Sequence, residues 1–362
     1  MNKKAVFPGQ YIQGQGAITE LLELINLFGS KGLILCSKSV KNNIFPKFAS
    51  QEIMNVPFEL FSGECCEDEL NRIAHIIKSK SIDVIIGAGG GKVIDTAKIA
   101  ADRADIPVIV VPTIASTDAP CSGCAVTYTP SGVFEAVHYQ KKNPSAVIVD
   151  LNIIANAPVR FLVAGMGDAL ATWFEARSCA NSQSKNECGG LTTLAGLHIA
   201  KLCYETILEY GVSAKTANEN HEITLALEYI TEANILLSGI GFESSGLASA
   251  HAVHNGLTAL EETHRYYHGE KVAFGVLTGL HLNAASSEEI NTVYSFCESI
   301  GLPTTLSELG ITKIDRNYIM KAAENACIEG SSIFHESCIV TVDKVLDAML
   351  IADSFGNLRK IN

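Results

Sequence analysis

The feature that most constrains the fold is a regular alternation of short apolar runs and helical periods in the first half of the chain. Three runs rich in Val, Ile and Leu have the composition of buried parallel strands: 32–36, 83–86 and 107–111. Residues 67–80 and 93–104, which lie between these runs, carry apolar side chains at helical spacing. The resulting strand, helix, strand, helix, strand order predicts a parallel sheet covered by helices.

Further strand signals end near Asp150. Residues 125–128 and 132–138 flank a Thr-Pro-Ser turn and predict a hairpin laid over the sheet, and residues 146–149 predict a last strand. Beyond that point, seven segments have apolar residues at intervals of three and four: 158–180, 191–210, 222–240, 246–260, 272–282, 288–300 and 316–325. We therefore expect an α/β domain over residues 1–157 and a helical domain over residues 158–362.

Composition narrows the class of protein. The net charge of −12 and the lack of a Lys/Arg cluster argue against nucleic-acid binding, which depends on basic side chains facing phosphates. Apolar runs such as residues 106–111 are much shorter than the roughly 20 residues of a membrane helix, so we expect no membrane partner. The first ten residues are not followed by an apolar stretch of signal-peptide length. Eleven cysteines without a repeating spacing fit reduced thiols in a cytoplasm.

A glycine-rich loop stands between the second predicted strand and its helix. Residues 87–92 read Gly-Ala-Gly-Gly-Gly-Lys, and the amides and dipole of the following helix start favour a phosphate. The loop is neither a regular GxGxxG nor a P-loop, because Lys92 occupies the sixth position and Val93 replaces Ser or Thr. The residues alone fit either a dinucleotide pyrophosphate site or an ordinary tight turn.

A second polar segment, residues 112–118 (PTIASTD), follows the third predicted strand. Ligands of doubly wound sheets bind beyond the carboxyl ends of the strands, where this segment and the glycine loop both lie. Thr113 and Ser116 could donate to phosphate or ribose, and Asp118 could accept from a substrate hydroxyl. The alternative is that Ser116 or Asp118 caps a helix.

Four of the ten histidines lie between His251 and Gly275. On a helix over residues 246–260, His251 and His254 project from the same face, and His268 could complete a metal site from the next turn. Two core histidines and one surface histidine are the alternative. The only CxxC motif, Cys121 to Cys124, lacks a second pair and is a weak zinc or redox signal.

Five long strings, in the same order along nearly the whole chain, resemble the glycerol dehydrogenases of the metal-dependent, iron-type alcohol dehydrogenase superfamily. They are GGGKVIDTAK from Gly89, PTIASTDAP from Pro112, GMGDALATWFEA from Gly165, GFESSGLASAHAVHNG from Gly241 and HGEKVAFG from His268. The resemblance implies a dehydroquinate synthase-like fold, a Rossmann-like parallel sheet followed by helices, that works as a homo-oligomer.

The resemblance also implies a role for each matching position. Zn²⁺ would be held by Asp168, His251 and His268. NAD would lie against Gly89, Gly90, Gly91, Lys92 and Asp95 at its pyrophosphate, and against Thr113, Ser116, Ser122, Cys124 and Tyr128 along its length. Asp118 would hold the polyol substrate, His254 would serve as a substrate-facing residue or proton carrier, and His264 would lie at the surface. Iron-dependent relatives have a histidine where this chain has Thr172, and three ligands with an open position are typical of catalytic zinc.

The position after the first strand departs from the family. Relatives commonly place an acidic residue there to bind the adenosine ribose, whereas this chain has Ser37 followed by Lys38. We still expect NAD rather than NADP, because one neighbouring lysine is weak evidence for recognition of a 2′-phosphate.

The predicted activity is zinc-dependent oxidation of glycerol, or another vicinal diol, to the corresponding ketone such as dihydroxyacetone. Three alternatives remain from the sequence. They are a carbon–oxygen lyase of the dehydroquinate synthase type, another polyol dehydrogenase of the superfamily, and a non-catalytic protein that kept the fold. The lyase would require a basic cluster beside the metal, where only Arg265 and Lys271 are present. A non-catalytic protein would be expected to have a broken ligand set.

Overall fold

The computed structural model describes residues 2–361 and divides into two compact units. The sheet unit contains residues 6–159 and 217–239, and the helical unit contains residues 2–5, 160–216 and 240–361. The chain leaves the sheet unit two residues beyond the predicted boundary at 157. A single boundary was nevertheless too simple, because residues 217–239 return to pack with the sheet and residues 2–5 belong with the helices.

The sheet unit is built on six parallel strands. Their order across the sheet is β1-β8-β5-β4-β2-β3. The bounds are Tyr11–Gly14 for β1, Gly32–Cys36 for β2, Phe58–Leu60 for β3, Val84–Gly89 for β4, Val108–Pro112 for β5 and Ala146–Asp150 for β8. Every residue of β2, β4, β5 and β8 is buried, as expected for strands covered on both faces. The predicted parallel sheet is therefore confirmed, with two additional strands, β1 and β3, at its edges.

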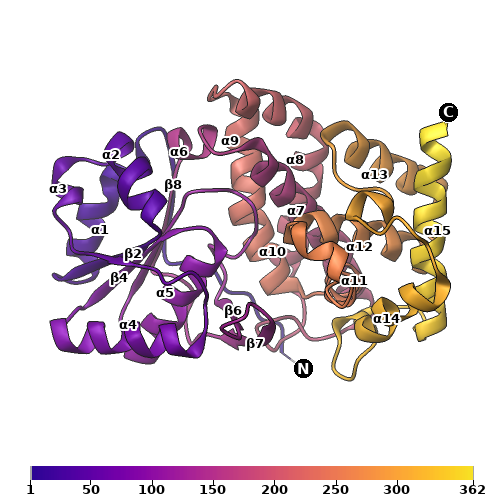
Figure 1. The fold of residues 1–362 in the computed structure, drawn as a ribbon, viewed down its shortest axis with the longest axis horizontal. Coiled ribbons are helices and arrows are strands. Elements are labelled where there is room, and N and C mark those ends of the chain that lie inside the picture. The colour runs from indigo at the N-terminus through magenta and orange to yellow at the C-terminus, as the bar shows by residue number, and fades with distance from the viewer. Residues whose placement is uncertain (1, 362) are drawn as a thin grey trace. The chain divides into compact units, whose positions relative to one another are not determined.

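Helices cover both faces of this sheet. Figure 1 shows α1 (Leu21–Phe28), α2 (Phe45–Phe48) and α3 (Gln51–Met54) on one side and α4 (Glu67–Lys80) and α5 (Gly91–Ala104) on the other. Short helices complete the unit: η1 (Ala17–Glu20), the π-helix η2 (Val40–Ile44), α6 (Leu151–Ala155), α9 (Leu225–Glu232) and the π-helix η3 (Ala233–Leu237). The predicted helices at 67–80 and 93–104 correspond to α4 and α5.

The order of the strands reverses between β2 and β4. From β2 the chain proceeds outward to β3, then returns to β4 on the other side of β2 and continues to β5. Such a switch point opens a crevice at the carboxyl ends of the two central strands, which is where nucleotides bind to doubly wound sheets. Ser37 follows β2 directly, and the glycine loop ends β4. The topology thus places both predicted cofactor segments at this crevice.

The predicted hairpin forms a sheet of its own. Strands β6 (Cys124–Tyr128) and β7 (Phe134–Tyr139) pair antiparallel, with an irregularity in register at Thr127 and Tyr128. The hairpin packs on α5.

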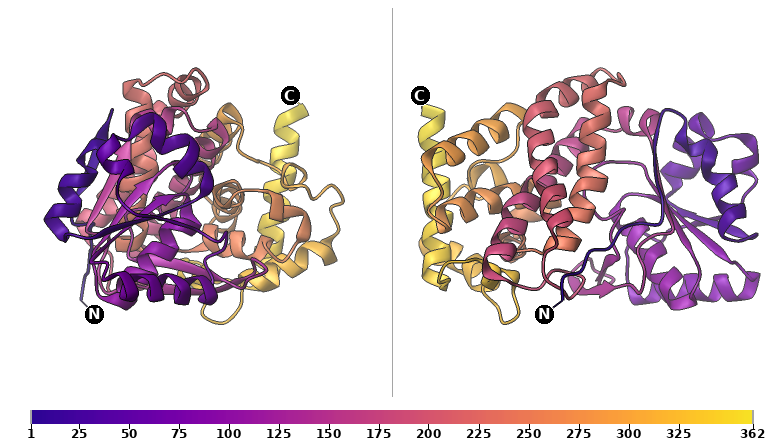
Figure 2. Two further views of the ribbon diagram at one scale, coloured as in Figure 1. Left: turned by 60° about the vertical axis from the view of Figure 1, so that its left-hand side comes forward. Right: turned by 180° about the vertical axis from the view of Figure 1, so that it is seen from behind.

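The second unit is helical. Its helices are α7 (Val159–Ser182), α8 (Leu194–Glu219), α10 (Ser238–Ser245), α11 (Ser249–Leu257), α12 (His268–Leu282), α13 (Ser287–Ile300), α14 (Arg316–Ala326) and α15 (Val342–Ile361), with short 3-10 turns at Glu261–Arg265, Ser307–Leu309 and Ser332–His335. Figure 2 shows α15, in yellow, running alongside the orange helices, and it packs on α12 and α14.

Several predicted helix bounds were wrong. The helix expected at 246–260 is the shorter α11. Gly246 adopts a φ of 106°, which is not helical, so the helix begins only after it. The helix expected at 222–240 is interrupted by a π-helical turn and continues into α10, up to Ser245. α12 begins four residues before the predicted 272, at His268, and α15 was not predicted.

Two glycines let α12 begin directly against α7. A Cβ atom on Gly269 would lie 1.8 Å from the carbonyl oxygen of Ala164, and one on Gly167 would lie 2.4 Å from the carbonyl oxygen of Gly269. Arg160, at the start of α7, also forms a two-pronged ion pair with Glu270, with Nε–Oε1 at 2.7 Å and Nη2–Oε2 at 2.9 Å. The first turn of α12 is therefore fixed to α7, and with it His268.

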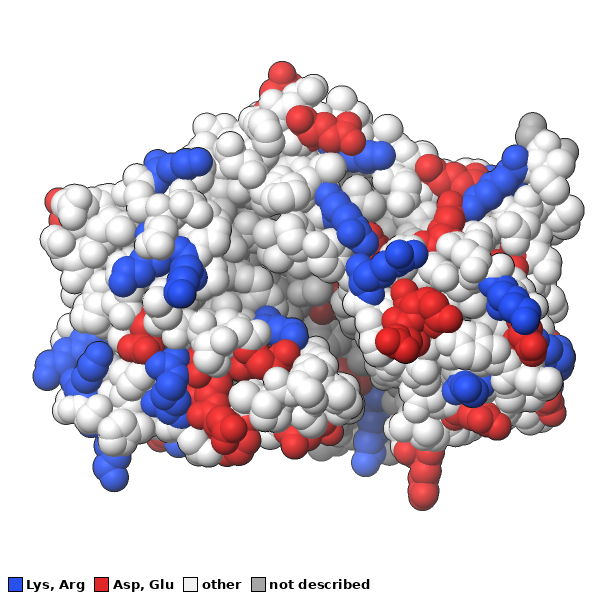
Figure 3. Space-filling model, viewed as in Figure 1, with Lys and Arg blue, Asp and Glu red and all other residues white. Residues whose placement is uncertain are grey.

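No helix among residues 2–361 is both long and apolar enough to cross a membrane. On the face drawn in Figure 3, the lysines and arginines stand among acidic side chains.

We expect Gly269→Ala to destabilise the protein, although alanine is the better helix former by about 1 kcal/mol. The added methyl group would overlap a backbone carbonyl that cannot move aside, and overpacking of this kind costs about 1–3 kcal/mol or more. Chemical denaturation should therefore show a lower free energy of unfolding. Gly14→Ala is the matched control, since a Cβ there meets no atom within 4 Å. Equal stability of the two variants would contradict this packing.

Candidate metal centre and cofactor loop

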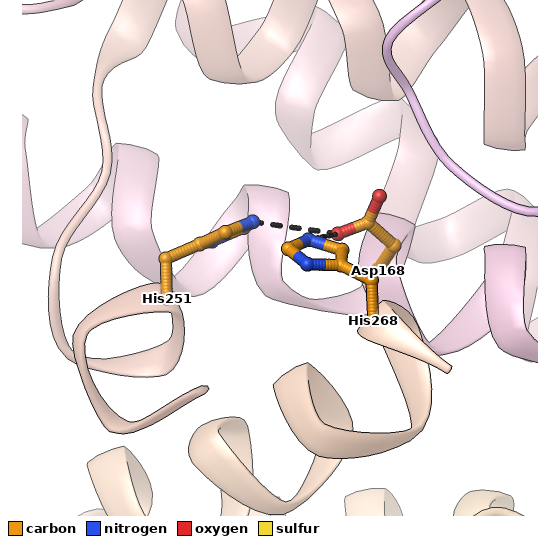
Figure 4. A group of neighbouring side chains, drawn as sticks. All are labelled: Asp168, His251 and His268. Atoms are coloured by element: carbon orange, nitrogen blue, oxygen red, sulfur yellow. Dashed lines mark ion pairs between the residues drawn. The ribbon is translucent and has the colours of Figure 1, made fainter. Parts of the chain in front are cut away.

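The helical unit brings Asp168, His251 and His268 together from three helices. Asp168 lies in the middle of α7, His251 near the start of α11, and His268 is the first residue of α12. Their ligand atoms all lie within 4.8 Å of one another, and they are the only such group of three among residues 2–361. Figure 4 shows the carboxylate and the two imidazole rings directed toward one another. The fold thus brings together the three residues that the family resemblance implied as metal ligands.

The distances inside the group suit a small cation. Oδ1 of Asp168 lies 3.4 Å from Nε2 of His251 and 3.1 Å from Nε2 of His268. Ligands at about 2.0–2.2 Å from a tetrahedral zinc ion are separated by about 3.3–3.6 Å from one another. The two distances from Asp168 are therefore close to those that such a site needs.

A buried carboxylate that the sequence analysis did not single out holds the first histidine. Oε2 of Glu175 lies 2.6 Å from Nδ1 of His251, and Oε1 accepts hydrogen bonds from the amides of Ala248 and His251 at 2.8 and 3.0 Å. Glu175 is 1% exposed. A carboxylate in this position keeps the proton of a neutral imidazole on Nδ1, which leaves the Nε2 lone pair free.

The tautomer with its proton on Nδ1 leaves His251 able to bind a metal ion through Nε2. With its proton on Nδ1, His251 directs the Nε2 lone pair at Oδ1 of Asp168, which also has only lone pairs to offer. Two acceptors facing each other in a buried space repel unless a cation lies between them, either a proton or a metal ion. The donor set, one carboxylate and two imidazoles, is one that zinc and iron both accept.

His254 lies beside the second histidine. Its Nε2 atom is 3.0 Å from Nδ1 of His268, and its own Nδ1 is 3.0 Å from Oδ1 of Asn255. It is not part of the three-residue group. The geometry therefore places His254 behind His268, where it orients the ring of that residue. His264 is exposed.

The electrostatics of the group follow from burial and close charges. Burial alone would raise the pKa of Asp168, but the imidazoles of His268 and His251 hold that pKa well below its usual range. Burial would likewise lower the pKa of His251, yet Glu175 and Asp168 raise it well above the ordinary value. Burial, together with the nearby His268 and Lys271, lowers the pKa of His254. The site favours negative charge on oxygen and positive charge between its ligands.

In the sheet unit, the glycine loop opens onto the start of α5. Gly90 is the N-cap residue of α5 and provides no side-chain cap, and a Cβ on Gly91 would meet no atom within 4 Å. The amides of Val93 and Ile94 donate to the carbonyl oxygen of Gly90 at 3.1 and 3.2 Å, and the positive end of the dipole of this 14-residue helix lies at the glycine loop. A helix start of this kind suits a phosphate, and the pyrophosphate site stays a prediction.

The second cofactor segment is joined directly to this loop. The amide of Thr113 donates to the carbonyl oxygen of Gly89 at 3.0 Å, which continues the pairing of β5 with β4. Thr113 is buried and Ser116 is half-buried. Neither Ser116 nor Asp118 begins a helix, so the alternative of a helix cap was wrong for both.

A buried lysine organises the residues that follow. Nζ of Lys98, on α5, donates to the carbonyl oxygens of Ala119 and Cys124 and lies 3.4 Å from Oγ of Ser122. Lys98 is 1% exposed. Its ammonium group thereby fixes the turn that carries Ser122 and Cys124, two residues expected along the cofactor. Nothing in the sequence distinguished Lys98 from an ordinary surface lysine of α5.

The lysine of the glycine loop already has a partner. Nζ of Lys92 lies 2.5 Å from Oε2 of Glu64 and 4.9 Å from the centre of the Tyr128 ring. Both Lys92 and Tyr128 were expected at the cofactor, whereas Glu64 was not. A pyrophosphate on this loop would therefore meet a lysine whose charge is partly balanced by Glu64.

Three other predicted residues lie in the same unit. Asp95 is buried in α5, where Oδ2 accepts from the amide of Val126 at 3.1 Å. Asp118 is buried, and Oδ2 accepts from the hydroxyl of Ser238 at 3.0 Å. Ser37 caps the following turn, because its hydroxyl accepts from the amide of Val40 at 3.3 Å.

We expect Glu175→Gln to weaken zinc binding by about 10- to 100-fold, the usual cost of losing a carboxylate behind a metal-bound histidine. His251→Ala, which removes a ligand, should weaken it further. Chelator competition on the purified protein measures both. Glu289→Gln is a matched control, because it removes a helical-unit carboxylate that pairs only with Arg177 in the bonds seen here. Zinc affinity equal to that of the unsubstituted protein in Glu175→Gln would contradict the role of Glu175.

Asp95 predicts a pH-dependent stability. Burial raises its pKa from 3.8 to about 6, although Lys98 and the Val126 amide oppose the shift. The folded state therefore binds the proton more tightly than the unfolded state, and the free energy of unfolding should fall as pH rises from about 4 to about 6. A shift of about two units corresponds to about 3 kcal/mol. Asp95→Asn should remove this pH dependence, which denaturant unfolding of both proteins between pH 4 and 7 measures. A constant difference in the free energy of unfolding between the two proteins over that range would contradict it.

Comparison with known proteins agrees with this architecture. Residues 8–151 match the family model described as iron-containing alcohol dehydrogenase. The chain is 49% identical to a glycerol dehydrogenase from Thermotoga maritima, with 98% of each chain covered. It is 42% identical to a glycolaldehyde reductase from Halobacterium salinarum, with 96% of each covered. The crystal structure of a probable glycerol dehydrogenase from Sinorhizobium meliloti 1021 superposes with a TM-score of 0.93 at 44% identity, covering 98% of this chain and 99% of that one.

Near-complete coverage at this identity extends the assignment beyond the matched sheet unit to the helices that carry Asp168, His251 and His268. The chain is therefore an alcohol dehydrogenase enzyme that belongs to the iron-containing alcohol dehydrogenase family, among its glycerol dehydrogenases.

Proposed function

We propose that this protein catalyses NAD-linked oxidation of glycerol to dihydroxyacetone at a zinc ion held by Asp168, His251 and His268. The observation that carries the proposal is the convergence of Oδ1 of Asp168 with Nε2 of His251 and Nε2 of His268 from three helices, with Glu175 behind His251. The near full-length likeness to a glycerol dehydrogenase supports the choice of substrate.

Zinc is proposed over iron because of the number of ligands. The site offers three protein atoms, and Thr172, one helical turn after Asp168, offers no imidazole. Three protein ligands and one open position form the usual catalytic zinc site. When bound there, the metal polarises a substrate oxygen and lowers the pKa of a coordinated hydroxyl.

The chain's own residues supply orientation. Glu175 and His254 fix the rings of His251 and His268, so that both Nε2 atoms face the same point. The carboxylate of Asp168 reduces the net charge there and contributes one ligand atom. We assign the pyrophosphate of NAD to the uncapped start of α5, where Gly89, Gly90 and Gly91 allow the backbone to come close.

Asp118 is proposed to select diols. Its buried carboxylate accepts from the hydroxyl of Ser238, and a carboxylate can accept from a second hydroxyl of a polyol in the same way. A site built to hold a hydroxyl group discriminates strongly against an analogue that lacks it. On this assignment, the protein would prefer vicinal diols to simple alcohols.

Three further expectations remain proposals. NAD is preferred to NADP although Ser37 stands where relatives have an acid. His254 carries the proton released from the substrate. The protein works as a homo-oligomer in the cytoplasm, and its eleven cysteines, all without disulfide partners, fit a reducing compartment.

A second candidate activity is reduction of a small hydroxyaldehyde. The glycolaldehyde reductase relative supports it, since that protein is 42% identical over nearly its whole length. Reduction and oxidation use the same groups in opposite directions, so the two activities differ in substrate and not in the site. The lyase alternative has less support, because the relatives reported above are dehydrogenases and a reductase.

We expect the zinc-loaded protein to reduce NAD with glycerol, 1,2-propanediol or 2,3-butanediol, more slowly with 1-propanol, and not at all after removal of the metal. Asp118→Asn should raise KM for glycerol more than KM for 1-propanol, because only the diol uses the second hydroxyl. Spectrophotometry of NADH formation measures each rate. Failure of the zinc-loaded protein to reduce NAD or NADP with any of the three diols would contradict the proposed function.

A further inference from the structure

The backbone just before α11, the helix that carries His251, is not helical, so contacts from elsewhere in the chain must fix it. α10 ends at Ser245 and α11 begins at Ser249, and Gly246 between them has a φ of 106°. Ala248, the N-cap residue of α11, has no side chain that could cap the helix. His251 lies in the first turn after this break. The position of its ring therefore depends on how residues 246–248 are held.

A short segment from near the C-terminal end of the chain holds the residues before and at the start of α11. Residues 332–336, which we call the clasp, bond to three consecutive residues ahead of His251. The hydroxyl of Ser332 donates to the carbonyl oxygen of Ala248 at 2.8 Å. Nδ1 of His335 lies 2.8 Å from the carbonyl oxygen of Leu247. Oε1 of Glu336 accepts from the amide of Ser249 at 3.0 Å.

Glu336 also connects the other two helices that carry the metal-site residues. Its Oε2 atom accepts from the hydroxyl of Ser178 on α7 at 2.5 Å and from the side-chain amide of Asn283 at 2.9 Å. Asn283 is the C-cap residue of α12. One buried carboxylate, 6% exposed, thus bonds to α7, α11 and the end of α12, the helices that carry Asp168, His251 and His268.

The start of α11 is therefore held by two carboxylates from different parts of the chain. Glu175 accepts from the amides of Ala248 and His251, and Glu336 accepts from the amide of Ser249 between them. Amides of a first helical turn lack partners within the helix and bond strongly to carboxylates. Neither acid alone satisfies all three amides.

We propose that Glu336 is a positioning residue of the metal centre, which acts through the start of α11 to fix the orientation of His251. The inference rests on the proposed metal site. Glu336 forms no bond with Asp168, His251 or His268 among those seen here, so its effect is transmitted through the backbone.

The decisive variant is Glu336→Gln. The amide keeps the size of the side chain, but its NH₂ group must face either the donors on Ser178 and Asn283 or the amide of Ser249, so at least one bond is lost. Asp353→Asn is the matched control. Asp353 is equally buried and accepts from the amide of Leu306 at 2.8 Å, but it holds α15 and not a helix that carries a metal-site residue.

Three quantities separate positioning from general stability: the zinc dissociation constant by chelator competition, the visible absorption spectrum of the Co²⁺-substituted protein, and the melting temperature. We expect Glu336→Gln to raise the zinc dissociation constant about 10-fold or more and to alter the Co²⁺ spectrum. Asp353→Asn should lower the melting temperature comparably while leaving zinc affinity within about 2-fold. Zinc affinity and Co²⁺ spectrum unchanged in Glu336→Gln would overturn the inference.

Milder variants keep the test decisive if Glu336→Gln does not fold. Ser332→Ala and Ser178→Ala each remove one hydrogen bond of the clasp and should weaken zinc binding severalfold. Affinity equal to the unsubstituted protein in both would also overturn the proposal. Absence of zinc binding in the unsubstituted protein would contradict the proposed metal site itself and is a separate result.

Discussion

The hydrogen bond between Glu175 and Nδ1 of His251 is the interaction on which the chemistry of this protein depends. When the imidazole is neutral, this bond keeps its proton on Nδ1 and leaves the Nε2 lone pair facing Asp168, as a metal ligand requires. Without that bond, a proton on Nε2 could bond directly to the carboxylate, and the three residues would satisfy one another as a neutral buried network. The carboxylate behind His251 therefore favours the proposed metal site over an ordinary hydrogen-bonded core.

Helix packing supplies the second requirement, which is distance. His268 reaches Asp168 only because α12 begins against α7 at Gly167 and Gly269, where side chains would exclude it. The break at Gly246 and the bonds from Glu175 and Glu336 bring the start of α11 to the same place. In the sheet unit, the start of α5 has no side-chain cap and follows three glycines, which suits the phosphate that we propose there.

The sequence predicted the elements whose signal is local and strong. Strands β2, β4 and β5 were found because they are continuous apolar runs, and α4 and α5 because their periodicity is regular. β1 and β3 were missed, since each is short and half-buried and so lacks either pattern. α15 was missed as well, although it spans 20 residues. The length of α11 was wrong because a single glycine, Gly246, outweighed the helical spacing around it.

The candidate site was predictable only in part, because only some of its residues lie close together in the sequence. His251 and His268 attracted attention as histidines close in sequence, but Asp168 was reached through resemblance to a family and not from spacing. Glu175 could have been noticed, because it lies seven residues after Asp168 and hence on the same face of one helix. Glu336 and Lys98 gave no comparable signal. Their roles exist only in three dimensions, where each bonds to backbone atoms far away in the chain.

The central claim is that three side chains fixed by the fold form one zinc site, and diffraction at the zinc absorption edge tests it most directly. Crystals of the protein grown with Zn²⁺ should show an anomalous peak about 2.0–2.2 Å from Oδ1 of Asp168 and from Nε2 of both His251 and His268, with Glu175 still bonded to Nδ1 of His251. A peak elsewhere, or an empty site in which Asp168 bonds directly to a protonated imidazole at saturating zinc, would contradict it.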